Sequence, residues 1–280
     1  MRPKWAVTID APDPARALVE TAIAESPTLR TAVPGELGAL ATLRVANDAV
    51  TIADAGGPLL QPLRFPSDLD RVLAQLANLG VAQGIRELEG EHGVLAGELA
   101  IELGTVRDGR PRPLPDHGEV LGLRDRYYVS VERRGQRTLF VHALTISARG
   151  KIAVLTHFAR GGVALDRRNP SVVLGQRADG AILGVGLRWP DGLPRTGLPR
   201  LTEFVVIATP AITDLSGLET RDPVVMRSGA SQLQGALAQL CDGNYRASSA
   251  GGRDGCFVKR LSILLAPDEP STGDLARQGV

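Results

Sequence analysis

The chain opens with apolar residues that alternate with polar or small ones over Lys4–Asp10, which indicates a strand with one buried face. A helix is predicted to follow, with Asp13 as its cap and Pro14 in its first turn, and to end near Pro27. The periodicity of the apolar positions changes from two to about 3.6 at this boundary. The sequence therefore begins as a strand followed by a helix.

Two short β-type runs come next, Leu40–Val45 and Val50–Ala53. Asn47 and Asp48 lie between them, and both residue types tolerate the positive φ that a tight primed turn requires. We therefore predict a β-hairpin. The strand, helix and hairpin are the first three parts of a small unit.

A second helix is predicted after Ser67, because Ser67 and Asp70 have the spacing of a capping box. Apolar residues then repeat at helical spacing, and Gly80 is expected just beyond the end of the helix. Residues 1–90 thus predict a small α+β domain of the order β-α-β-β-α.

From residue 91 to 267 the pattern changes to short strands separated by turn residues every ten to fifteen positions. This spacing is typical of an antiparallel, immunoglobulin-like β-sandwich. One late helix is predicted over Ser228–Cys241, and residues 268–280 are expected to form a flexible tail. The predicted strands are Glu98–Leu103, Tyr127–Glu132, Thr138–Ser147, Lys151–Thr156, Val172–Gly175, Ala181–Leu187, Leu201–Thr209 and Phe257–Ala266. The expected fold class is α+β.

Composition excludes several classes of function. Lys and Arg total 32 against 31 Asp and Glu, so the net charge of +1 gives no reason to expect nucleic acid as a partner. The sequence has no apolar run of the roughly 20 residues that a membrane span needs. We expect a cytoplasmic protein in which Cys241 and Cys256 are thiols, although they bracket a polar loop and could pair in an oxidising compartment.

A histidine followed by glycine, His92-Gly93, has the form of a caspase-type catalytic histidine. Such a mechanism needs a cysteine at the end of a strand, activated by that histidine. Cys241 ends the predicted late helix and Cys256 lies in a glycine-rich loop, so neither has this context. We interpret His92 as a turn residue. A small cysteine hydrolase that uses Cys241 or Cys256 with His92 or His157 remains the alternative.

Other candidate residues have simpler structural explanations. His142 and His157 fall on or beside adjacent strands and could share a metal, but Asp166 is not at a spacing that makes it a third ligand. The glycine-rich run Gly180–Gly186 lacks the strand-loop-helix context of a phosphate site, so we expect a packed strand. Ser216 follows Asp214 in a loop without a nucleophile elbow, and we expect a turn or a cap.

Tyr127 and Tyr128 should point to opposite faces of one strand, so that one is buried and the other exposed. Arginines flank this strand, and an exposed tyrosine beside them would make a contact patch or, more simply, a solvated edge. If the chain binds a partner, we expect the contacts on the loops Arg107–His117, Gly161–Asn169 and Asp242–Gly255.

The order of features after residue 120 resembles the region behind the peptidase domain of bacterial caspase-like, metacaspase-type proteins. The stretch Phe204–Glu219 is similar to a strand in that family followed by the pattern ATxPxxDxSxLE. Residues 1–90 are too short to be the protease domain that should precede this region. The other matching segments are Tyr127–Val131, Arg137–Leu144, Gly150–Thr156, Ser231–Leu240 and Val258–Ile263.

This resemblance implies a non-catalytic accessory or regulatory module that binds a caspase-like peptidase domain or another protein or ligand. The residues agree, because the sequence brings no acid, base, nucleophile or metal cluster together. We therefore assign no catalytic, cofactor-binding or metal-binding residue and expect no cofactor. The oligomeric state and the identity of the partner stay open.

Overall fold

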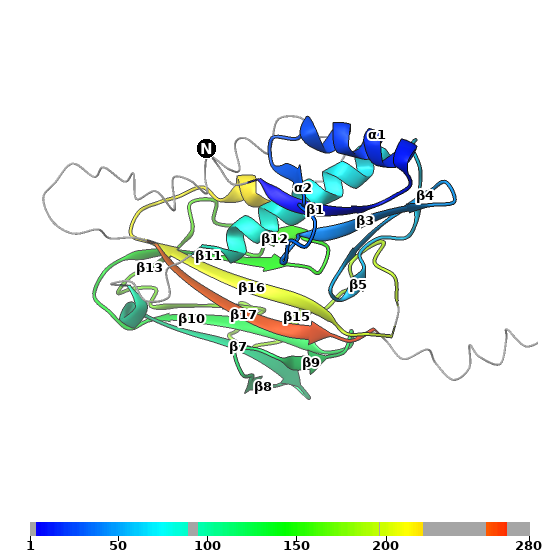
Figure 1. The fold of residues 1–280 in the computed structure, drawn as a ribbon. Helices are drawn as coiled ribbons and strands as arrows, with labels where there is room; N and C mark the ends of the chain where they lie inside the picture. Colours follow the sequence, from blue (N-terminus) through cyan, green and yellow to red (C-terminus); the bar gives the residue numbers. More distant parts are fainter. Residues whose placement is uncertain (1–3, 89–94, 196, 221–255, 268–280) are drawn as a thin grey trace, which may run out of the picture.

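The computed structural model describes residues 4–88, 95–195, 197–220 and 256–267. Within these residues the chain forms two α-helices and three β-sheets, which confirms the predicted α+β class. Figure 1 shows the first sheet with its helices on one side of the molecule and the two remaining sheets stacked beyond it. The predicted late helix and the predicted tail lie outside the described residues.

The first sheet is mixed. Its strand order is β2-β1-β3-β4-β5, with β6 also paired to β4, and β1 runs parallel to β2 and β3. The helices α1 (Asp13–Ala24) and α2 (Leu69–Arg86) pack their apolar faces into the core of this sheet. The strands are β1 (Trp5–Asp10), β2 (Leu29–Thr31), β3 (Ala41–Ala46), β4 (Ala49–Asp54), β5 (Gly57–Pro58) and β6 (Leu63–Arg64).

The predicted hairpin is confirmed. β3 and β4 pair in an antiparallel register that closes at Ala46 and Ala49, so two residues form the turn. Asn47 has φ 49° and Asp48 has φ 56°, and positive φ at both central residues defines the primed turn. The local sequence therefore specifies this connection.

The starts of the helices differ from the prediction. The cap of α1 is Pro12, so Asp13 is already helical. The cap of α2 is Asp68, and neither helix has a side-chain capping hydrogen bond, so the predicted capping box at Ser67 is wrong. The Asp68 carboxylate instead accepts a hydrogen bond from the Arg64 amide at 3.0 Å, which closes a turn in the segment just before the helix.

The helix α2 also ends later than predicted. It continues past Gly80 to Arg86, because Val81, Ala82 and Ile85 are buried against a second apolar surface beyond the first sheet. Gly80 lies under the indole of Trp5, where a Cβ atom would come within 2.6 Å of the ring. This glycine permits a close helix-strand contact and does not end the helix.

The second and third sheets face each other across one apolar core, in a β-sandwich-type arrangement. The second sheet has the order β14-β10-β7-β8, with β15 beside β10, and contains β7 (Leu99–Arg107), β8 (Arg110–Pro113), β10 (Arg126–Arg133), β14 (Ser171–Leu174) and β15 (Val185–Gly186). A 3₁₀ turn, η1 (Ala96–Glu98), precedes β7.

The third sheet has the order β12-β11-β16-β17-β9, with β13 beside β11. Its pairings are antiparallel except that β9 and β17 are parallel, which the purely antiparallel prediction missed. A second 3₁₀ turn, η2 (Ser216–Leu218), follows β16. The strands are β9 (Glu119–Leu121), β11 (Leu139–Ile146), β12 (Ile152–Val154), β13 (Val163–Leu165), β16 (Arg200–Thr209) and β17 (Phe257–Leu265).

Two predicted loops contain strands, and one predicted strand consists mostly of turns. The predicted contact loop Arg107–His117 contains β8, which forms a hairpin with β7 around Asp108 and Gly109, both at positive φ. The loop Gly161–Asn169 contains β13. The predicted strand Ala181–Leu187 shrinks to β15 and one bridge, because the glycines there form turns.

Both tyrosines of β10 are buried, so the prediction of one exposed ring is wrong. Tyr127 faces the core between the sheets and contacts Phe204, with ring centroids 4.7 Å apart. Tyr128, on the other face, lies over Gly104 of the neighbouring strand, where a Cβ atom would come within 2.2 Å of the ring. Its hydroxyl donates a hydrogen bond to Glu102 at 2.7 Å. Because Gly104 has no side chain, the ring of Tyr128 can pack directly against the neighbouring strand and become buried.

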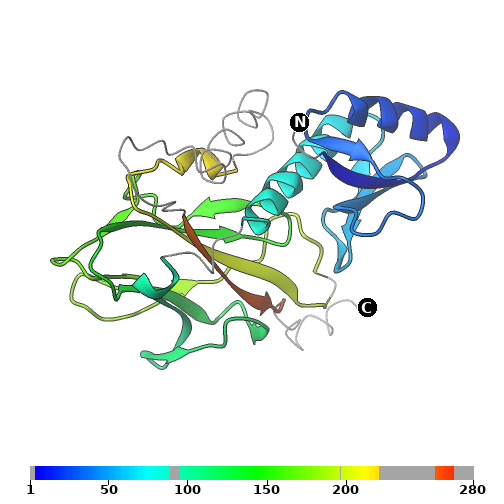
Figure 2. The same cartoon turned by 60° about the vertical axis from the view of Figure 1, so that its left-hand side comes forward.

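The helix α2 links the two halves of the molecule. Its first part belongs to the core of the first sheet, and its last part joins a third apolar cluster on the outer face of the third sheet. Figure 2 shows this helix running from the first sheet toward the sandwich. The predicted boundary at residue 90 follows this helix directly, and α2 contributes side chains to cores on both sides.

Candidate binding cleft

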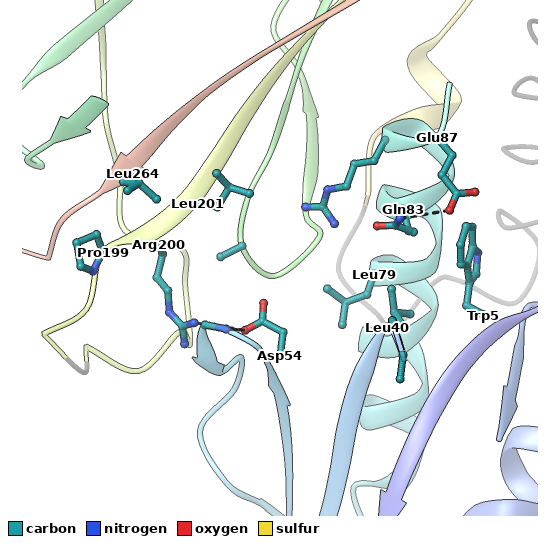
Figure 3. A pocket seen from close by; sticks show the side chains of 15 residues that line it. Trp5, Leu40, Asp54, Leu79, Gln83, Glu87, Pro199, Arg200, Leu201 and Leu264 are labelled. Carbon is teal, nitrogen blue, oxygen red and sulfur yellow. Dashed lines mark hydrogen bonds and ion pairs between the residues drawn. The ribbon is translucent and has the colours of Figure 1, made fainter. Parts of the chain in front are cut away.

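A cleft of about 440 Å³ lies where the first sheet, α2 and the third sheet meet. Figure 3 shows its walls, which come from segments more than a hundred residues apart in the sequence. Its main lining residues are Trp5, Leu40, Asp54, Leu79, Gln83, Arg86, Glu87, Pro199, Arg200, Leu201 and Leu264.

The apolar part of the cleft comes from regular structure. Leu201 and Leu264 are directly paired across β16 and β17, so both side chains stand on the same face of the sheet. Trp5 and Leu79 supply the opposite wall. β16 pairs with β11 only from Glu203 onward, so among the described strands the residues before Glu203 pair with β17 alone.

A buried guanidinium closes one end of the cleft. The Arg200 side chain is only 3% exposed, and its Nη1 lies 3.5 Å from a carboxylate oxygen of Asp54. It also donates a hydrogen bond to the Pro58 carbonyl. A Cβ atom at position 56 would lie 2.5 Å from Nη1, so Gly56 leaves the space that this side chain fills. Arg200 thereby fastens the third sheet to the hairpin of the first.

A second ion pair stands at the α2 wall. Arg86 contacts Glu203 at 2.5 Å, and both side chains are mostly buried. Arg260 donates a hydrogen bond to the Arg86 carbonyl, and Gln83 donates one to Glu87 at 3.3 Å. The charged side chains of the cleft are thus held by partners within the protein.

Exposed apolar residues stand next to lining residues of the cleft in the sequence. Leu37 is 95% exposed and directly precedes the lining residue Gly38, and Leu198 is 59% exposed and precedes Pro199. Leu201 itself is 42% exposed. Large apolar side chains that remain in water beside a cleft are typical of a surface that binds another molecule.

The structure also brings Ser216 together with the two histidines that the sequence placed on or beside adjacent strands. His142, His157 and Ser216 line a smaller pocket of about 270 Å³ on the outer face of the third sheet. His142 is buried, and this burial lowers the pKa of its imidazole. Among the described residues, no group of three or more His, Cys, Asp or Glu side chains is arranged to hold a metal ion.

The remaining candidates have structural roles. Asp166 accepts hydrogen bonds from the amides of Arg168 and Asn169 at 2.7 and 2.8 Å, which closes its own turn. Asp214 accepts one from the Ser216 amide at 2.8 Å, as expected for a turn. The predicted contact loop Asp242–Gly255 lies outside the described residues.

The cysteine-hydrolase alternative gains no support from Cys256. This residue packs against the apolar cluster between α2 and the third sheet, and burial raises the pKa of its thiol. A nucleophilic cysteine needs the opposite shift, toward the thiolate. Cys241 and His92 lie outside the described residues, so the hypothesis stays a prediction for those positions.

Comparison of the chain with models of protein families, with curated proteins and with solved structures finds no match. Neither helix in the described part of the chain is long and apolar enough to cross a membrane. Sequence reasoning did not anticipate the cleft, because its walls are assembled by α2 and by Arg200 across the whole length of the chain.

Proposed function

We propose that the chain is a non-catalytic binding module that holds an apolar segment of a protein partner in the cleft between its first and third sheets. The observation that carries this proposal is the combination of an apolar floor, Leu201 and Leu264, with exposed Leu37 and Leu198 beside it. Burying such side chains contributes about 25 cal/mol for each Å² removed from water.

The pairing of the charged groups supports binding over catalysis. Arg86 is held by Glu203, and Arg200 is held by Asp54 and the Pro58 carbonyl. Groups that act as acids, bases or nucleophiles need freedom to exchange protons or to attack a substrate. The paired charges instead fix the cleft walls, which lowers the entropy cost of binding.

We take the partner to be a protein, and a caspase-like peptidase domain is the specific candidate that the resemblance of residues 204–219 suggests. An extended segment suits the site because, among the described strands, β16 has no second neighbour before Glu203, and its backbone there can pair with an added strand. Its side chains would meet Leu201 on one side and Trp5 on the other.

A photo-crosslinking amino acid at position 201 tests this proposal with a purified caspase-like peptidase from the same genome. We expect a crosslinked product at position 201 and none at position 183, a matched exposed leucine outside the cleft. Leu37→Ser should weaken binding of the partner, measured by calorimetry, while Leu183→Ser should not. Equal crosslinking at both positions, or binding that Leu37→Ser leaves unchanged, would refute the use of the cleft.

A further inference from the structure

His142 is a buried ionisable residue in the middle of a sheet. It stands on β11, on the outer face of the third sheet, and is 1% exposed. Two surface segments cover it, residues 155–162 and residues 210–219, and both contribute to the pocket that His142 lines. Because the ring can gain a proton and a charge as the pH falls, the packing of both segments over it is expected to depend on pH.

The ring is in close contact with each covering segment. The imidazole donates a hydrogen bond to the backbone carbonyl of Thr213, which favours the protonated ring and raises its pKa. A Cβ atom at position 162 would lie 2.9 Å from Nε2, so Gly162, at φ 91°, lets the chain pass close to the ring. The two segments also contact each other, because Thr213 donates to the Gly161 carbonyl at 3.4 Å and Ile212 lies against Gly161.

The Nε2 atom is buried and has no hydrogen-bond partner among the described residues. A neutral imidazole carries one N–H and one lone pair, so the bond to Thr213 leaves Nε2 as an unused acceptor. Protonation would convert that acceptor into a charged donor that has no acceptor in the described part of the chain. Burial of an unpaired charge is among the most costly changes in a protein interior.

Four charged or titratable groups surround this position. Asp214 and Glu219 belong to the second covering segment, and His157 and Arg160 to the first. Asp214 favours the protonated ring, while its own pKa is lowered mainly by hydrogen bonds from Ser216, so it stays ionised in mild acid. Arg160 offsets part of that negative charge. Burial outweighs these effects on His142.

We propose that protonation of His142 releases residues 155–162 and 210–219 from the outer face of the third sheet, so that this surface opens in acid. The covering segments carry Phe158 and Ile212, which are 64% and 69% exposed, and opening would rearrange this apolar surface. The switch is separate from the binding cleft, which shares no lining residue with the pocket.

The direction of the effect follows from linkage. The released state has an imidazole of ordinary pKa, near 6.5, whereas the closed state holds the pKa of His142 below that value. The closed state is therefore fully favoured above pH 6.5 and loses stability as the pH falls from there to the closed-state pKa. Within that window the open population rises by up to about tenfold for each pH unit.

Hydrogen exchange of the full chain between pH 7.5 and 5, corrected for intrinsic exchange rates, tests this switch. We expect accelerated exchange in residues 155–162 and 210–219 and unchanged protection in β10 on the opposite sheet. His142→Gln removes the titrating group and should abolish the pH dependence, while His157→Gln, at an exposed neighbouring imidazole, should preserve it. Wild-type exchange that does not change with pH would overturn the proposal.

Asp214→Asn supplies a second measurement that does not depend on the folding of the His142 variant. It removes the negative charge that favours the protonated ring, so the pKa of His142 in the closed state should fall further below 6.5 and the open population in acid should exceed that of the wild type. NMR titration of the His142 imidazole resonances should show the lower closed-state pKa in this variant. An open population in acid that stays the same while the closed-state pKa of His142 falls would show that this histidine does not control the opening.

Discussion

The two halves of α2 make an instructive comparison. The first half, with Val72, Leu76 and Leu79, fills the core of the first sheet, whereas the second half, with Val81 and Ile85, covers the third sheet. These side chains are buried in both halves, but only the first half belongs to the unit that the local sequence pattern defines. One helix can thus contribute buried side chains to two cores. The connection between the two units is then itself an apolar, buried interface.

The junction also carries polar contacts. Gln75 and Arg149 exchange hydrogen bonds, and the turn at Gly150 lies directly on the backbone of Leu79. Apolar burial supplies most of the free energy, and these directional contacts fix the position of the third sheet along the helix. The following variants test how far the two halves act as one structural element.

The largest effect is expected from replacing one large buried side chain by alanine in either half of the helix. Leu76→Ala and Ile85→Ala each remove a fully buried side chain and should lower the free energy of unfolding by about 2–5 kcal/mol. If the helix couples the two units, each variant should accelerate hydrogen exchange in both β1 and β11 under mild denaturant. If Ile85→Ala leaves the hydrogen-exchange rate of β1 unchanged, the two units unfold independently.

A smaller effect is expected at the turn that docks on the helix. Gly150 and Gly109 have nearly the same φ, 72° and 71°, but a Cβ atom at 150 would lie 2.9 Å from the Leu79 Cα, whereas position 109 is open. Ala at 109 should cost about 1–2 kcal/mol from backbone conformation alone. Ala at 150 should cost about 1–3 kcal/mol more from the clash. Equal losses in urea unfolding would contradict the close contact.

The ion pair at the end of α2 should matter less. Glu203→Gln leaves the mostly buried Arg86 without its counter-charge, and we expect a loss of about 1–3 kcal/mol, between the values for exposed and buried pairs. Glu20→Gln, in the exposed pair with Arg16, is the matched control and should change thermal stability little. A similar result for both variants would mean that the junction does not depend on this pair.

The smallest effect lies away from the junction. Tyr128→Phe keeps the ring over Gly104 and removes only the hydrogen bond to Glu102, which should cost about 0.5–1.5 kcal/mol. Its comparison is Tyr127→Phe, whose hydroxyl lies in the sandwich core, where burial raises the pKa of Tyr127 to about 12. A larger loss from Tyr127→Phe than from Tyr128→Phe in chemical denaturation would show that the hydrogen bond to Glu102 is not the more important of the two hydroxyl contributions.

Local sequence patterns predicted an element correctly where its conformation depends on neighbouring residues in the sequence. The turn at Asn47 and Asp48 follows from the φ values those residues tolerate, and the strands β10, β11, β16 and β17 follow from short runs rich in apolar residues that turn residues separate. Predictions failed where a distant segment decided the outcome. Gly80 ends no helix because Trp5 and the third sheet lie against α2, and Tyr128 is buried because the neighbouring strand offers Gly104.

The sequence by itself determined the α+β class, the first hairpin, the change from helices to strands near residue 90 and the near-neutral charge. Only the tertiary structure decided which residues meet: Arg200 with Asp54 across the cleft, and His142 beneath two surface segments. The physical reason is that periodicity and turn chemistry act over a few neighbouring residues, whereas a cleft is made by burial between segments whose separation along the chain leaves no local pattern.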